Sequence, residues 1–292
     1  MEPERAAITY FQIFTFPAGT LPLRHFMIKL IVTDLDGSLL NDKKELPAGF
    51  WEFEKQLVQQ NIVLGIASGR PHHNLLALFE PIKDHTYFLS DNGSYVTYQG
   101  EELLVEMLDP EAVTAFVEKA RTLNQVYPVL CGKDKAYMEN KEESLLKQAL
   151  QYYQHYELVE DLTKVTEPIL KVSLCDLVDA ETNSYPHFKH YETAYKVAVA
   201  GERWLDFTAF NANKGVGVKL VQQALGVGYD ETMVFGDYLN DLEMMQVAKY
   251  SYAMKNAHPG IIAAANFMTS FNNNEEGVVR AICDSLVLEP QQ

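Results

Sequence analysis

Two aspartates separated by one residue follow a short apolar run and offer nucleophilic and acid–base chemistry. They are Asp34 and Asp36 in the segment Asp34-Leu35-Asp36-Gly37-Ser38, directly after the mainly apolar residues 29–33. A chain that leaves a buried strand also leaves its regular pleat, so both carboxylates can reach one site there. One carboxylate could attack phosphorus while the other transfers protons. A turn with two solvated aspartates has the same residue pattern, so the segment alone leaves both interpretations open.

Two further segments could bind a phosphoryl group. Ser68-Gly69-Arg70 follows the next apolar run, residues 61–67, and supplies a hydroxyl and backbone N–H groups for phosphoryl oxygens. Lys214 stands at the start of a predicted helix, where its charge opposes the helix dipole, which hints at a functional role. Taken singly, an ordinary strand–loop turn is the favoured interpretation of Ser68-Gly69-Arg70, and a structural or solvated lysine is the favoured interpretation of Lys214.

A fourth segment is suited to a metal ion. Asp237, Asn240 and Asp241 lie in Gly236-Asp237-Tyr238-Leu239-Asn240-Asp241, which follows the apolar residues 233–235. Three oxygen-bearing side chains between a strand and a helix suit a hard cation such as Mg²⁺. The alternative is an Asx-rich helix cap without a ligand.

Alternating strands and helices must position these four segments. Short apolar runs predict strands at residues 29–33, 61–67 and 87–90, and helical spacing predicts helices at residues 47–60 and 74–79. Asp91-Asn92-Gly93 is a turn signal. This order is typical of a doubly wound, Rossmann-like parallel sheet, an α/β fold.

The middle of the chain predicts a separate α+β insert over residues 94–206, which is long enough for a domain of its own. Its expected strands are residues 95–98, 103–106, 169–176, 195–200 and 203–207, and its expected helices are residues 111–123 and 141–153. The α/β order then returns with helices at residues 214–225, 241–247, 259–264 and 276–286, and strands at residues 232–235 and 251–253. We therefore expect a core formed by residues 27–93 and 207–292 and split by the insert.

The charge of the chain limits its partners. The 292 residues carry a formal net charge of −16, with 47% hydrophobic and 22% charged residues, as in an ordinary soluble protein. Nucleic acid is not expected as a partner, because phosphate backbones are bound by Lys/Arg patches that the sequence lacks. An acidic protein that binds anionic phosphates needs a divalent metal and a few placed cations.

Cysteine spacing and the first residues bear on location. Cys131, Cys175 and Cys283 lie far apart without a CxxC pair, which favours a reducing cytoplasm over a disulfide framework. Residues 1–26 are apolar in part, but acidic residues precede that stretch and prolines interrupt it, so neither a signal peptide nor a membrane span is expected. We expect a non-essential extension there, with a packing arm as the alternative.

The order and spacing of the four segments resemble the haloacid dehalogenase superfamily, from residue 27 to the end of the chain. Within it the sequence is similar to the Cof-type phosphatases, whose class IIB cap lies between the second and third motifs. Roughly 143 residues separate Arg70 from Lys214 here, which matches a cap at that place. Smaller matches are Asp91-Asn92-Gly93, residues 253–257 and residues 276–278. Ser38 and Lys255 depart from the usual threonine and small residue.

The resemblance implies roles for the site residues. Asp34 would attack phosphorus and become an aspartyl phosphate, while Asp36 would protonate the leaving oxygen and then activate water. Mg²⁺ would be held by the Asp34 carboxylate, the Asp36 backbone carbonyl and Asp237, with Asn240 and Asp241 in supporting places. Ser68, Gly69, Arg70, Lys214 and Asn240 would bind the substrate. Because Asp36 must be protonated part of the time, we expect its pKa to lie above the free value of about 4.

The implied enzyme is a magnesium-dependent phosphatase that acts on small phosphorylated metabolites. Sugar phosphates are the expected substrates, followed by pyridoxal phosphate and flavin mononucleotide. A phosphomutase that moves a phosphoryl group between sugar positions is the alternative, and a catalytically silent metabolite-binding protein is a third. A membrane partner is not expected, because the sequence lacks hydrophobic spans. A monomer is favoured because the cap needs freedom to move.

Overall fold

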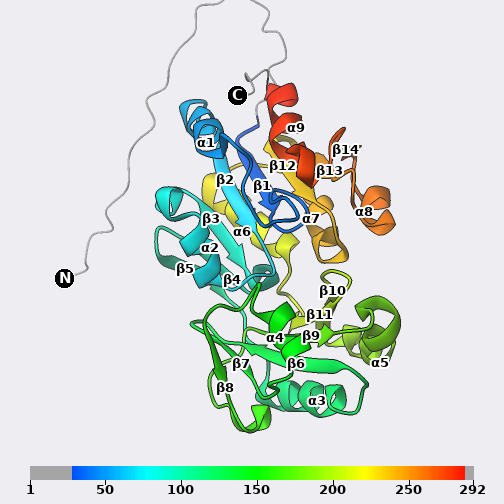
Figure 1. Ribbon diagram of the computed structural model, residues 1–292. Coiled ribbons are helices and arrows are strands. Elements are labelled where there is room, and N and C mark those ends of the chain that lie inside the picture. Colours follow the sequence, from blue (N-terminus) through cyan, green and yellow to red (C-terminus); the bar gives the residue numbers. More distant parts are fainter. Residues whose placement is uncertain (1–27, 287–292) are drawn as a thin grey trace, which may run out of the picture.

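The computed structural model describes residues 28–286, and the expected extension at residues 1–26 lies outside the described residues. Within the described range the strands form two sheets, one in the upper and one in the lower part of Figure 1. The chain passes from the first sheet to the second after β5 (Glu101–Val105) and returns after β11 (Trp204–Ala209). No helix between residues 28 and 286 is both long and apolar enough to span a bilayer.

The first sheet contains the predicted parallel strands. Its order is β14-β13-β12-β1-β2-β3-β4-β5, and β14 to β3 are parallel to one another. The parallel strands are β1 (Leu30–Asp34), β2 (Val63–Ala67), β3 (Tyr87–Ser90), β12 (Thr232–Gly236), β13 (Tyr250–Ala253) and β14 (Phe267–Met268). Every residue of β1 is buried, as expected for a strand that helices cover on both faces.

Helices pack on both faces of this sheet, so the predicted doubly wound α/β fold is confirmed. Neighbouring residues of β1 point to opposite sides: Ile31 joins one apolar cluster, and Leu30 and Val32 join the other. The first face carries α1 (Phe50–Gln59), α2 (His72–Leu78) and α9 (Gly277–Leu286). The second face carries α6 (Lys214–Leu225), α7 (Leu242–Met245) and α8 (Pro259–Ala264).

The second sheet is mainly antiparallel, with the order β10-β11-β9-β6-β7-β8. Its other strands are β6 (Val126–Cys131), β7 (Ala136–Met138), β8 (Tyr156–Leu158), β9 (Lys171–Asp176) and β10 (Tyr195–Val199). An apolar cluster around Phe116 and Phe207 joins the sheet to α3 (Pro110–Ala120) and α5 (Tyr185–Phe188). A cluster that includes Leu145 joins its other face to α4 (Glu143–Ala149).

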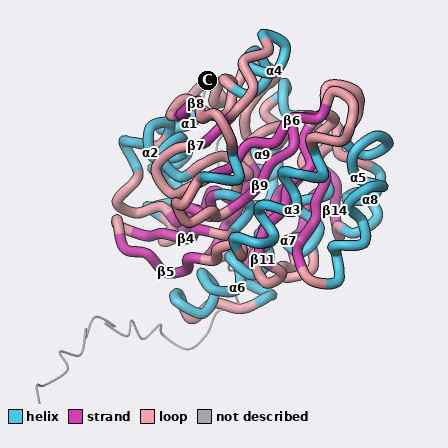
Figure 2. The backbone as a smooth tube through the Cα atoms, turned by 90° about the horizontal axis from the view of Figure 1, so that it is seen from below, coloured by secondary structure: helices cyan, strands magenta, loops and turns pink. Residues whose placement is uncertain are grey.

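The two strands that follow the expected start of the insert at residue 94 belong to the first sheet. β4 (Tyr95–Tyr98) pairs with β3, and β5 pairs with β4, so both strands extend the first sheet. Figure 2 shows β4 and β5 together at one edge of the molecule. The reason is local: the short Asp91-Asn92-Gly93 turn returns the chain directly beside β3, and consecutive strands joined this way pair. The division into core and insert stays a prediction, with a first boundary after β5.

Three strands of the second sheet were not predicted. β6 contains Pro128, which argues against an interior strand, and β7 and β8 span only three residues each. β6 and β7 pair locally, but β6 also pairs with β9 and β7 with β8 across longer separations, for which local propensity carries little signal.

Candidate active site

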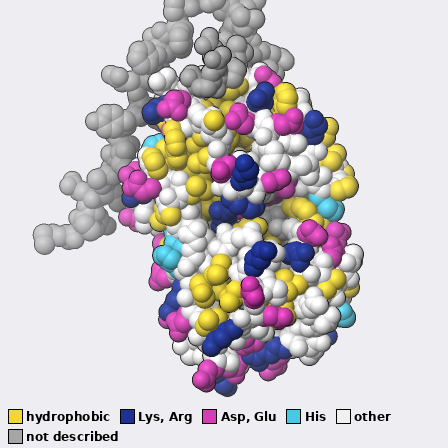
Figure 3. All heavy atoms as spheres, viewed as in Figure 1, with side chains coloured by type: hydrophobic (Ala, Val, Ile, Leu, Met, Phe, Trp, Pro, Cys, Tyr) yellow, Lys and Arg dark blue, Asp and Glu magenta, His cyan; other side chains and the backbone are white. Residues whose placement is uncertain are grey.

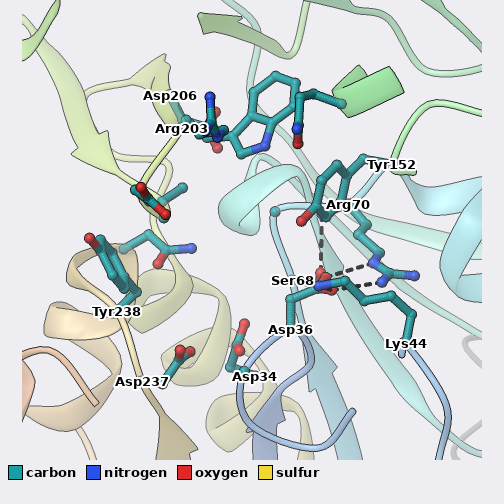
Figure 4. Close-up of a pocket in the computed structure, with 18 of the residues that line it drawn as sticks. Asp34, Asp36, Lys44, Ser68, Arg70, Tyr152, Arg203, Asp206, Asp237 and Tyr238 are labelled. Carbon is teal, nitrogen blue, oxygen red and sulfur yellow. Dashed lines mark hydrogen bonds and ion pairs between the residues drawn. The ribbon is translucent and has the colours of Figure 1, made fainter. Parts of the chain in front are cut away.

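The four predicted segments meet at the carboxyl edge of the first sheet. Asp34 ends β1, Ser68 follows β2 and Asp237 follows β12, and these three strands are direct neighbours. Asp34, Ser68 and Asp237 line a cavity of about 510 Å³, which is also lined by residues of the second sheet. Figure 4 shows Asp34 and Asp237 on one side of this cavity and Arg203 and Asp206 opposite them.

Lys214 forms two buried ion pairs at the base of the site. Its Nζ lies 2.5 Å from Asp34 Oδ1 and 2.6 Å from Asp241 Oδ1, and its side chain has no exposed surface. Burial alone would lower the pKa of Lys214, but Asp241 and Asp34 raise it above its ordinary value. The lysine therefore stays charged and neutralises part of the carboxylate charge around it.

Three carboxylates crowd beside this lysine. Asp34, Asp237 and Asp241 each offer an oxygen within 4.8 Å of the others. Burial raises the pKa of Asp34 to about 7, and burial followed by the charge of Asp34 raises the pKa of Asp237. The buried Oδ2 of Asp34 has no hydrogen-bond donor among residues 28–286. An all-oxygen donor set with a free buried oxygen fits a hard divalent cation.

Asp241 has little free capacity as a metal ligand. Its Oδ1 accepts from Lys214, and its Oδ2 accepts the backbone N–H groups of Asp237 at 2.9 Å and Tyr238 at 3.2 Å. The side chain thus holds the loop that follows β12. Asn240 lines the cavity and donates through Nδ2 to Asn92 Oδ1 at 3.1 Å.

Asp36 lies in a different environment from the one expected. Arg70 Nε donates to Asp36 Oδ2 at 2.6 Å, and Arg70 Nη2 and Lys44 Nζ each donate to Oδ1 at 2.7 Å, as the dashed lines in Figure 4 show. Burial would raise the pKa of Asp36, but the hydrogen bonds and charges of Arg70 and Lys44 outweigh it and lower that pKa below 3.8. The expected pKa above about 4 is therefore wrong for this conformation.

Sequence reasoning missed Lys44 and Tyr152. Lys44 has a left-handed φ of 65°, and the Tyr152 ring centroid lies 5.4 Å from its Nζ and 5.7 Å from the guanidinium carbon of Arg70. Nothing in the local sequence marks Lys44, a loop lysine, as a member of this site. The same is true of Tyr152, which lies in the part of the chain between β5 and β11. Figure 3 shows lysine and arginine side chains gathered in the middle of the molecular face that is seen in Figure 1.

Ser68 is placed to bind an anion. Its buried Oγ accepts from the backbone N–H of Arg70 at 3.1 Å, and within residues 28–286 its own hydroxyl proton has no acceptor. Both Ser68 and Gly69 line the cavity. A hydroxyl that still has a proton to donate suits a phosphoryl oxygen.

Gly37 brings the backbone close to Asp237. Its φ is +84°, and a Cβ at this position would lie 2.2 Å from Asp237 Oδ2. We expect Gly37→Ala to displace Asp237 and to abolish most of the rise in melting temperature that a divalent cation produces in the native protein. The control is Gly100→Ala, which has the same kind of backbone strain at φ +78° but no neighbour within 4 Å. An equal cation response in the two variants would contradict the assignment.

The raised pKa of Asp34 makes a second prediction, for protein kept in chelator. The pKa of Asp34 is about 7 in the folded protein and about 3.8 in an unfolded chain, so between these values the native state binds more protons and stability falls as pH rises. We expect the unfolding free energy of Asp34→Asn minus that of the native protein to increase over this range, as measured by denaturant melts. Asp42→Asn is the control, because Asn273 and Asn274 lower the pKa of Asp42 and its effect should have the opposite sign below pH 3.8. A difference for Asp34→Asn that is independent of pH would contradict the prediction.

Comparison with known proteins identifies the family. The family model for haloacid dehalogenase-like hydrolases matches residues 31–282. The 5-amino-6-(5-phospho-D-ribitylamino)uracil phosphatase YbjI of Escherichia coli K12 is 30% identical over 259 residues, which cover 87% of this chain and 95% of that protein.

Solved structures agree in fold. A crystal structure of a Streptococcus mutans UA159 protein has a TM-score of 0.82 and 28% identity, covering 89% of this chain and 99% of that one. A haloacid dehalogenase subclass IIB sugar phosphatase has a TM-score of 0.77 at 19% identity, covering 89% of this chain and 100% of its own, a likeness of fold alone. The chain therefore belongs to the haloacid dehalogenase-like hydrolases, and its enzyme class is that of a phosphatase.

Proposed function

We propose that this chain is a magnesium-dependent phosphatase that hydrolyses small phosphorylated metabolites through an aspartyl phosphate on Asp34. The observation that carries the proposal is the placement of the Asp34 carboxylate. It stands at the end of β1 and lines the cavity, with Oδ1 paired to Lys214 and Oδ2 without a partner among the described residues. Lys214 and a bound cation would not use all the lone pairs of this carboxylate, so an Asp34 oxygen remains available to attack phosphorus.

Each residue then has a task in two steps. An Asp34 oxygen forms a bond to phosphorus as the ester bond breaks and the leaving oxygen takes a proton. Water next attacks the same phosphorus, gives up its proton and restores the Asp34 carboxylate. Ser68 and Lys214 hold the phosphoryl oxygens, where charge spreads in the transition state. Bound Mg²⁺, held by Asp34 and Asp237, would supply the positive charge that brings a phosphate dianion to a carboxylate.

Asp36 transfers the protons in this proposal. Its ion pairs with Arg70 and Lys44 favour the carboxylate form, which suits the base that accepts a proton from water. Donating a proton to the leaving oxygen requires these cations to loosen their hold. Negative charge on an arriving substrate competes with Asp36 for Arg70 and Lys44, and both cations line the same cavity.

Removing one of the two cations tests the role of Asp36. Lys44→Met takes away a charge that lowers the pKa of Asp36, so we expect the limb of the pH–rate profile that reports Asp36 to move to higher pH. Lys43→Met is the matched control, because Lys43 is the exposed neighbour of Lys44. A profile that stays unchanged in Lys44→Met would contradict this assignment of the proton transfers.

Sugar or sugar-alcohol phosphates are the substrate class we propose. A cavity of about 510 Å³ has the size of ordinary metabolite sites. Opposite the catalytic aspartates it is lined by Tyr152, Arg203 and Trp204, which offer flat apolar surfaces and a cation. The Escherichia coli relative is named for a phosphoribitylaminouracil, a sugar-alcohol phosphate that carries a ring, and a substrate of that kind would use both features.

The proposal extends to organisation and location. In this proposal the insert begins after β5 and contains the second sheet. It acts as a cap that closes over the site and excludes water. We also propose a cytoplasmic monomer. The three cysteines are free and buried, in keeping with a reducing compartment.

Phosphate release from a panel of phosphorylated metabolites with Mg²⁺ tests the proposal, with Asp34→Asn in parallel. We expect the native protein to release phosphate and Asp34→Asn to lose at least about 1000-fold in rate, because it lacks the nucleophile. Chelator should abolish the native activity, and Mg²⁺ should restore it. Equal release by both proteins would refute Asp34 as the nucleophile. An isomerised sugar phosphate without phosphate release would indicate a phosphomutase instead.

A further inference from the structure

The Asp91-Asn92-Gly93 turn at the end of β3 has an uncommon backbone. Its three residues have φ values of 48°, 58° and 88°, so all are left-handed in succession. Left-handed backbone is unfavourable for residues with a Cβ, and Asn and Asp adopt it as single residues more often than others, but seldom in succession. Such conformations persist only where the surrounding structure determines them, and they concentrate at functional sites.

The backbone of this turn contacts the predicted phosphoryl-binding segments. Asp91 N–H donates to the Arg70 carbonyl at 3.1 Å, and Asn92 N–H donates to the Ser68 carbonyl at 3.0 Å. A Cβ on Gly93 would lie 2.5 Å from the Asn213 carbonyl oxygen, directly before Lys214. The turn therefore packs between the segment after β2 and the start of α6.

The Asn92 side chain joins this turn to both sides of the cavity. Its Nδ2 donates to Asp206 Oδ2 of β11 at 2.5 Å, and its Oδ1 accepts from Asn240 Nδ2 at 3.1 Å. Asn92 is buried, with 4% of its surface exposed. Asp206 belongs to the second sheet, whereas Asn240 belongs to the loop that holds Asp237.

Asp206 is itself held firmly. Ser173 Oγ donates to its Oδ1 at 2.6 Å, and Tyr153 donates to Ser173 at 2.9 Å. The buried Lys171 Nζ lies 3.8 Å from Asp206 Oδ2 and 3.3 Å from Asp91 Oδ1, and it also donates to the Gly69 carbonyl. Strands β9 and β11 thus present a fixed carboxylate to the Asn92 amide.

The chemistry of the amide gives this arrangement a direction. An ionised carboxylate only accepts hydrogen bonds, so Asp206 requires the NH₂ end of the Asn92 amide to face it. The carbonyl end then faces Asn240 and accepts from it. We propose that Asn92 is a positioning residue. It couples the position of β11 against the first sheet to Asn240 and the loop after β12, so the active site is ordered only when Asp206 accepts the hydrogen bond of Asn92. This inference rests on the proposed phosphatase function and deepens it.

Exchanging the amide and the carboxylate tests the proposal. In Asn92→Asp, the carboxylate at position 92 faces the carboxylate of Asp206. In Asp206→Asn, the amide donors at positions 92 and 206 face each other, or the Asn92 amide turns and points its donor toward Asn240. The double variant restores one donor and one acceptor: Ser173 can still donate to the amide now on β11, and Asn240 can still donate to the carboxylate now in the turn. The matched control is Asn183→Asp, which removes a similar amide donor to Asp176, at 3.1 Å, within the second part of the chain.

Two measurements are compared: steady-state kinetics with the best panel substrate, and hydrogen exchange of residues 237–241. We expect each single variant to lower kcat about 10- to 100-fold with KM changed by less than about threefold, and to speed exchange in this loop. The double variant should recover most of both losses, and Asn183→Asp should change neither. If Asn92→Asp does not fold, Asp206→Asn and the double variant make the same comparison.

Two outcomes would overturn the proposal. One is a loss of melting temperature in the single variants with kcat and loop exchange unchanged, which indicates a purely structural contact. The other is a double variant whose losses equal the product of the single losses. If the native protein releases phosphate from no substrate, the proposed function fails, and the exchange of residues 237–241 alone decides this inference.

Discussion

The site depends on one buried charge, the ammonium of Lys214. A lysine without exposed surface at a helix start is costly on its own, and two carboxylates within 2.6 Å stabilise it. In return, its charge allows the Asp34 and Asp241 carboxylates to lie close to Asp237. Gly215 helps to bring this helix start close, because a Cβ there would lie 2.6 Å from the Glu243 carbonyl oxygen. Asp34, the loop after β12 and the start of α6 are therefore parts of one electrostatic arrangement.

Local charge, and not the net charge, governs the cavity. The chain carries −16 overall, yet Lys44, Arg70, Lys171 and Arg203 line the cavity together with its carboxylates. Interactions over short distances in a partly buried site outweigh distant surface charges, which salt screens. An acidic protein can therefore bind an anion where cations converge with the carboxylates that we propose as metal ligands.

The α/β core could be predicted because its signals are local. The apolar run before Asp34, the run before Ser68 and the run before Asp237 each became a buried parallel strand, and their carboxyl ends met as expected. The sheet to which β4 and β5 belong could not be predicted from their own residues, because the pairing of β4 with β3 is decided by a turn and by partners outside the segment.

The charge environment of Asp36 was also not readable from its sequence neighbours. Its partner Arg70 lies 34 positions away, and Tyr152 comes from beyond β5. Contacts of this kind are set by how two parts of the chain pack, and a motif does not carry that information. Burial would raise the pKa of Asp36, and the hydrogen bonds and charges of Arg70 and Lys44 outweigh it and lower that pKa.

The route of the chain between its two sheets has a consequence for modularity. Within residues 28–286 two connections join the two sheets, one after β5 and one after β11. The part between them, the proposed cap, could therefore be replaced by a related lid without altering the order of the strands in the first sheet. Asp206 lies within β11, the strand that ends at the second junction, and it contacts the Asp91-Asn92-Gly93 turn through Asn92. A transplanted lid would therefore carry new selectivity only together with a matching carboxylate at this seam.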